Sequence, residues 1–93
     1  HYMGLGPVLA RFPNAKVLAR PEVRREIAEE FRAKWRHWSP VFGDQLPREP
    51  VLPEAFSGEY TALEGERIVW VDMPPAETRY ATAFHLPSLR AVI

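Results

Sequence analysis

The side chains best suited to chemistry are few and widely separated in this sequence. Its three histidines are His1, His37 and His85, and there is no cysteine. Histidine is the usual general base and a common metal ligand, but His37 lies between Arg36 and Trp38 in a helical pattern, so we expect it to face solvent. The sequence has no serine nucleophile elbow, phosphate-binding loop or Cys/His zinc cluster. These residue types alone predict no catalytic centre.

The composition limits the class of protein. At 93 residues the chain is long enough for one small domain and too short for two. Twelve basic residues balance twelve acidic ones, so no overall field attracts nucleic acid or an anionic membrane. No apolar run approaches the roughly 20 residues that span a bilayer, and no signal peptide is visible. We therefore expect a cytoplasmic chain with no nucleic-acid or membrane partner.

The first half of the sequence predicts a helix, a strand and a second helix. Residues 2–12 favour a short helix, in which Pro7 is tolerated only near the start. Residues 16–19 are typical of a short apolar strand. A long helix follows from Pro21, and its apolar residues are spaced 4, 4, 4 and 3 residues apart, which places them on one face. Those residues are Val23, Ile27, Phe31, Trp35 and Trp38.

The second half predicts strands. Residues 43–56 contain three prolines and no helical or strand period, which favours a connector or a lid. Strand patterns then cover 59–63, 67–73, 80–86 and 89–93, with a turn at Glu64–Gly65. The expected fold class is therefore α/β (α+β), in the order helix, strand, helix and four mainly antiparallel strands.

Trp35 and Trp38 permit two interpretations. Arg32, Lys34 and Arg36 lie close to them in sequence, a combination that can stack on a ligand or bind a partner. Both rings also continue the apolar face of the helix. We therefore expect a core or a subunit interface as the simpler explanation.

The stretch HYMGLGPVLARFPNAKVLA resembles metallo-β-lactamase-fold hydrolases. His1 stands where the last histidine of their His-x-His-x-Asp-His motif would be, and Gly4 stands at the glycine that follows. The stretch LEGERIVWVDM is similar to a hairpin of the family, and the closing TAFHLPSLRAVI is similar to its strand pair before a Gly-Asp motif. The resemblance covers essentially the whole chain.

The resemblance implies that residues 1–93 are a single segment of a four-layer αββα sandwich. Within it, 1–42 would be helix, strand and helix, 43–56 the proline-rich connector, and 57–93 the strands. The parent would be a metal-dependent hydrolase of a small-molecule ester, thioester, lactam or phosphoester. In this family a dinuclear zinc centre activates water and polarises the bond to be cleaved.

The resemblance also implies an incomplete ligand set. His1 would be a zinc ligand in the parent. The family's next histidine lies in a Gly-His-Thr turn, and in the first alignment its position falls on Pro75. An alignment shifted by two residues places Glu77 at that position, where it would be an oxygen ligand. A third alignment places Tyr80 there. His85 corresponds to a structural strand histidine of relatives. We expect no catalytic or cofactor-binding residue in this chain and no zinc bound by it alone, and whether the parent is an active enzyme stays open.

A second hypothesis is a non-enzymatic interaction or oligomerisation module that uses the apolar helix face of Val23, Ile27, Phe31, Trp35 and Trp38. An isolated sandwich segment would also expose one face of its sheet, which predicts a homo-oligomer or a swapped dimer. A nucleic-acid binder using the basic helix is a weaker third hypothesis, because the net charge is zero.

Overall fold

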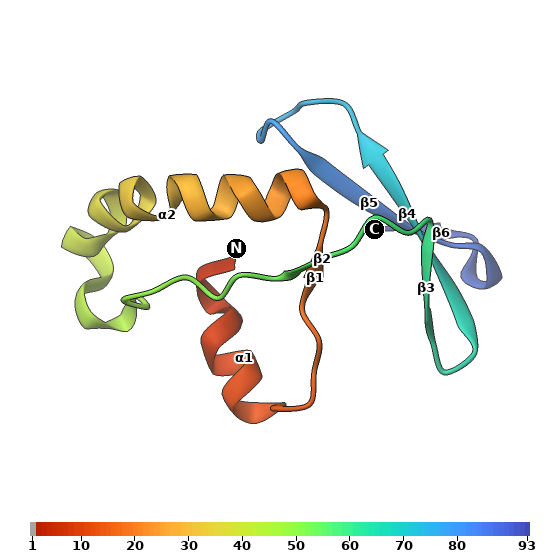
Figure 1. Ribbon diagram of the computed structural model, residues 1–93, viewed down its shortest axis with the longest axis horizontal. Helices are drawn as coiled ribbons and strands as arrows, with labels where there is room; N and C mark the ends of the chain where they lie inside the picture. Colours follow the sequence, from red (N-terminus) through yellow and green to blue (C-terminus); the bar gives the residue numbers. More distant parts are fainter. Residues whose placement is uncertain (1) are drawn as a thin grey trace. The chain divides into compact units, whose positions relative to one another are not determined.

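The computed structural model describes residues 2–93 and has a mixed α+β fold, as the sequence predicts (Figure 1). The chain divides into two compact units, of which the first ends at Ala55 and the second comprises Phe56–Ile93. The boundary lies one residue before the end of the proline-rich connector, 43–56. The two units are described separately below.

The first unit contains two α-helices and a pair of very short strands. A 3₁₀ turn at Tyr2–Gly4 leads into α1, which spans Leu5–Arg11 and carries Pro7 in its first turn, where a missing N–H costs nothing. The remaining elements are β1 (Leu18–Ala19), α2 (Pro21–Phe42), a 3₁₀ turn (Gly43–Gln45) and β2 (Glu54–Ala55).

Helix α2 continues through Pro40 and ends at Phe42. A proline inside a helix leaves the carbonyl four residues earlier without its N–H donor, and here that carbonyl belongs to Arg36. The Ser39 hydroxyl donates to the Arg36 carbonyl oxygen at 3.3 Å, which replaces the missing bond. Gly43, with a φ of 54°, then ends the helix, and its N–H donates to the Ser39 carbonyl.

The core of the first unit lies under the N-terminal half of α2. Ile27 and Phe31 are 7% and 4% exposed, and Ala19 of β1 is also buried. Arg24 Nε donates to the carbonyl oxygen of Pro53 at 2.9 Å, which ties the helix to the returning connector. The predicted apolar face is therefore buried at its centre, while Trp38 near the C-terminal end of α2 is exposed.

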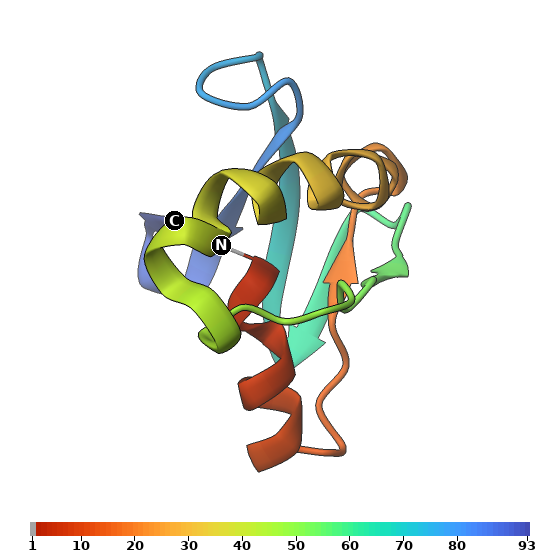
Figure 2. The ribbon, with the colours of Figure 1, turned by 90° about the vertical axis from the view of Figure 1, so that its left-hand side faces the viewer.

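The connector is more regular than its sequence predicts. The prediction of no strand in residues 43–56 is wrong, because Glu54–Ala55 forms β2 and pairs in parallel with β1, Leu18 opposite Glu54. Figure 2 shows the two strands side by side, β1 in orange and β2 in green. A strand of two residues has too few positions to display an alternating pattern, and its partner is distant in sequence.

The second unit is a four-stranded antiparallel meander. The strands are β3 (Tyr60–Leu63), β4 (Glu66–Met73), β5 (Ala81–Leu86) and β6 (Ala91–Val92), paired in that order, with a 3₁₀ turn at Pro87–Leu89. The predicted turn is confirmed: Glu64 and Gly65 have φ values of 52° and 83°. Positive φ at both central residues is what a two-residue type I′ hairpin requires.

Trp70 on β4 forms the centre of the second core. It is 9% exposed, and its ring centroid lies 4.8 Å from that of Phe56 and 5.0 Å from that of Phe84. Its indole Nε1 donates to Thr61 Oγ1 at 3.1 Å. A Cβ at Gly58 would lie 2.5 Å from the Phe56 ring, so a larger residue there would force that ring to shift.

Within residues 2–93, no helix is long and apolar enough to cross a membrane.

Candidate functional site

Of the two predicted metal ligands, the structure describes only Glu77. His1 lies outside the described residues. Glu77 lies in the exposed loop between β4 and β5, with Pro75 two residues before it. That loop is held by two local bonds, from the Ala76 N–H to the Thr78 carbonyl and from the Thr78 hydroxyl to the Tyr80 carbonyl.

The other histidines do not join Glu77. His37 on α2 is exposed, as predicted, and its ring meets Trp38 edge-on at a centroid distance of 4.8 Å. His85 is a half-buried residue of β5. Among residues 2–93, no three histidine, cysteine or acidic side chains are close enough to share a metal ion.

One face of the four-stranded sheet is apolar and exposed, and we refer to it as the open face. Trp70 and Phe84 point to the opposite face, so the register assigns the residues on either side of them to the open face. Val71, Met73 and Val92 on this face are 39%, 46% and 69% exposed. By strand pairing the open face comprises Tyr60, Ala62, Arg67, Val69, Val71, Met73, Ala81, Ala83, His85 and Val92.

The central strands lack the alternation of a sheet that faces water. A half-exposed antiparallel sheet alternates apolar and polar residues, whereas residues 68–71 read Ile-Val-Trp-Val and residues 83–84 read Ala-Phe. Arg67 and His85 interrupt the open face with a basic group, and Arg67 lies over the Tyr60 ring at 4.1 Å. This pattern is typical of strands that are covered on both faces.

A first hollow in the first unit lies beside the N-terminal 3₁₀ turn and holds about 560 Å³. Lys34 in its wall makes an ion pair with Glu30, four residues earlier on α2, at 2.6 Å, and the hydrogen bond in this pair raises the pKa of Lys34. Burial raises the pKa of the Tyr2 phenol, whose hydroxyl has no hydrogen-bond partner among the described residues. The hollow is lined by Tyr2, Met3, Gly4, Lys34, Trp38, Phe42, Gln45, Leu46 and Pro47.

A second hollow on α2 holds about 740 Å³ and is lined by Phe31, Arg32, Trp35, Arg36 and Arg48. We call it the arginine hollow. Arg48 comes from the connector and had no role in the sequence analysis. Trp35 Nε1 is shielded from solvent and has no hydrogen-bond partner among the described residues, an arrangement that costs about 1–3 kcal/mol. The sequence indicates part of this hollow, because Trp35 lies close to Arg32 and Arg36 along the helix.

Comparisons with known proteins find no match, whether to a protein-family model, to a curated protein or to a solved structure.

Proposed function

We propose that the chain is a segment of a metallo-β-lactamase-fold, metal-dependent hydrolase of the cytoplasm, acting on an ester, thioester, lactam or phosphoester. In this proposal the rest of the protein supplies most ligands of the zinc centre. The contribution of residues 56–93 is structural: their sheet docks against a second apolar layer, as in a sandwich.

The open face is the observation that carries this proposal. Val71, Met73 and Val92 expose apolar surface on a sheet whose other face already carries the Trp70 core. Burying apolar surface stabilises a protein by about 25 cal/mol per Å², so a sheet that is apolar on both faces is most stable between two layers. The order of elements from α1 to β6 is the one that the resemblance implies, apart from the additional strand β2.

The isolated chain is expected to self-associate through the open face. Val71 lies on β4, an inner strand of the sheet, and Val71→Lys places a charge that association would have to desolvate. We expect sedimentation velocity at several concentrations to show dimers or larger species for the original chain. The dissociation constant of the Val71→Lys chain should be higher by at least about tenfold, equivalent to about 1.4 kcal/mol.

Ser57→Lys is the matched control, because it adds the same charge at an exposed position outside the strands. It should leave the association unchanged. A chain that stays monomeric at the highest concentration would show an independent small fold and would contradict the proposed docking role.

Zinc binding tests the part of the proposal that assigns most metal ligands to the rest of the protein. Calorimetric titration of this chain with zinc is expected to show no tight stoichiometric binding, because a dinuclear centre needs several converging imidazoles and a carboxylate. The same titration of a longer gene product that includes the flanking sequence should show tight binding. Tight stoichiometric binding to the 93-residue chain would contradict the assignment of most ligands to flanking residues.

The second candidate is the non-enzymatic interaction or oligomerisation module. Ile27 and Phe31 of the proposed helix face are buried within the first unit, whereas Trp38 is 43% and Phe42 44% exposed. Partner contact through α2 would therefore use its C-terminal end. Monomerisation by Trp38→Lys with no effect of Val71→Lys would favour this module over docking through the sheet.

A further inference from the structure

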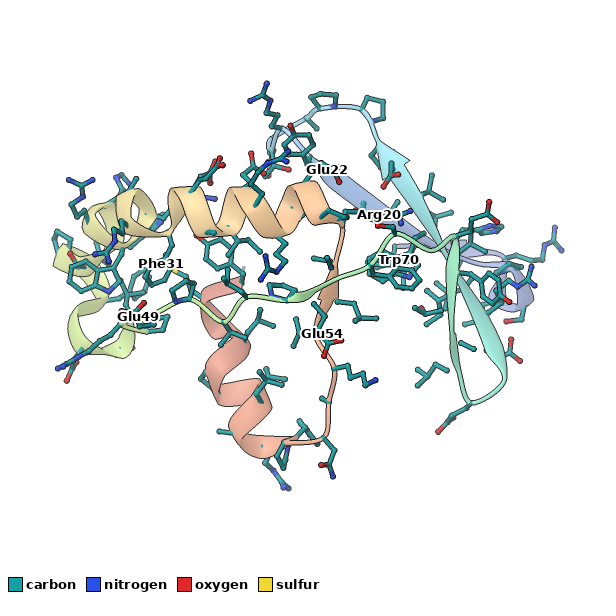
Figure 3. All side chains as sticks on the ribbon, in the orientation of Figure 1. Arg20, Glu22, Phe31, Glu49, Glu54 and Trp70 are labelled. Carbon is teal, nitrogen blue, oxygen red and sulfur yellow. The ribbon has the colours of Figure 1, made fainter. Side chains whose placement is uncertain are left out.

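The arginine hollow is built from two adjacent rows of α2 and one residue of the connector. Phe31 and Trp35 lie one helical turn apart, and so do Arg32 and Arg36. Arg48 reaches the same hollow from the connector after the chain has reversed direction. Figure 3 shows Phe31 on α2 and Glu49 on the connector, on the same side of the helix. The hollow therefore combines an aromatic wall with three guanidinium groups.

The three guanidinium groups carry a positive charge that the chain does not neutralise locally. Among the described residues, Arg32, Arg36 and Arg48 have no ion pair with a carboxylate, and the one hydrogen bond of this group joins Arg36 Nε to the Arg32 carbonyl at 3.4 Å. Glu49 follows Arg48 in sequence, and Glu29 precedes Arg32 by about one turn, but neither lines the hollow. A bound anion would relieve the repulsion among the three cations.

The aromatic wall supplies the second part of a binding site. Phe31 is 4% exposed and fixed by the core, and Trp35 is half-buried beside it. The indole N–H of Trp35 has no acceptor among the described residues, so a ligand oxygen is one group that could pair with it. Trp35, the more exposed of the two rings, gives a flat ligand ring a surface to pack against, because aromatic rings stack favourably with one another.

We propose that the arginine hollow binds a small phosphate ester that carries an aromatic ring. The planar guanidinium group of arginine can donate two parallel hydrogen bonds to two oxygens of one phosphate group. A phosphate monoester carries nearly two negative charges at neutral pH, which suits three cations better than the single charge of a carboxylate. The volume of about 740 Å³ falls within the range of about 300–1,000 Å³ for small-molecule sites. This site is independent of the open face and of zinc.

The test compares simple probes by calorimetry and by NMR of the indole N–H signals. Phenyl phosphate is expected to bind saturably and more tightly than inorganic phosphate, which lacks the ring, and than benzoate, which has one charge. It should shift the indole signal of Trp35, identified by its loss in Trp35→Phe. Binding should weaken as salt is raised, because the site is exposed enough for screening.

Arg48→Gln is expected to weaken phenyl phosphate binding by at least about tenfold, the effect of losing a charge-assisted hydrogen bond. Arg25→Gln is the matched control, because Arg25 lies on the same helix, is exposed and does not line the hollow. Circular dichroism checks that both variants keep α2. Equal weakening by the two variants, equal affinity for phenyl phosphate and inorganic phosphate, or no saturable binding of any probe would overturn the proposal.

Discussion

Trp70→Ala is expected to lower the free energy of unfolding by about 3–5 kcal/mol, the usual cost of removing a buried aromatic side chain. Trp70 touches both Phe56 and Phe84, and no other residue of the second unit is as buried. At about 4–8 °C per kcal/mol for a chain of this size, the melting temperature should fall by at least about 12 °C. Thermal and urea unfolding followed by circular dichroism measures this loss.

Trp70→Phe distinguishes the contribution of the aromatic ring to stability from that of the indole hydrogen bond. It keeps an aromatic ring near Phe56 and Phe84 but removes the donor to Thr61 Oγ1, so we expect a smaller loss, about 1–2 kcal/mol. The variants are compared at one protein concentration, because self-association makes the melting temperature depend on concentration. An alanine variant no less stable than the phenylalanine variant would contradict the central role of the ring.

Phe31→Ala is expected to lower the free energy of unfolding of the first unit by a similar amount, about 3–5 kcal/mol. Phe31 is the least exposed apolar residue, and its ring lies 6.5 Å from that of Tyr2. Its loss would leave a void between α2 and the N-terminal turn. Urea unfolding should show a lower midpoint and a reduced helical signal at moderate urea, since α2 is the longest helix of the described residues.

Phe12→Ala makes the same chemical change at a position that is 58% exposed. The expected effect on the free energy of unfolding is within about 0.5 kcal/mol, because exposed substitutions away from special features rarely exceed that. Equal destabilisation by the two variants would mean that burial does not decide the outcome, contrary to the assignment of Phe31 to the core.

The two proposals for this chain depend on different surfaces and can fail separately. The hydrolase segment rests on the open face around Val71 and on ligands outside residues 2–93. The phosphate-ester site rests on Arg48 and Trp35 in the first unit. A monomeric chain that still binds phenyl phosphate would contradict the docking of the sheet and leave the phosphate-ester site intact. A dimer that binds no probe would contradict the phosphate-ester site and leave the hydrolase segment intact.

The sequence by itself determined the elements whose signals are local. The spacing of Ile27 and Phe31 predicted the buried side of α2, because side chains four residues apart share a helix face. Glu64–Gly65 predicted its hairpin, because a two-residue turn sets the register of the strands beside it. Pro21 marked the start of the long helix, whereas Pro40, which the sequence favours as part of its end, did not stop it, since Ser39 satisfies the carbonyl that proline leaves free.

Only the tertiary structure decided what depends on distant residues. The pairing of Leu18 with Glu54 and the approach of Arg48 to Arg32 and Arg36 both require the chain to reverse direction after α2, and no local pattern encodes that reversal. The exposed side of the sheet also follows from the burial of Trp70, because in sequence both faces of β4 carry apolar residues, Ile68 and Trp70 on one face and Val69, Val71 and Met73 on the other. Physically, periodicity reports which residues share a face, whereas burial depends on what packs against that face.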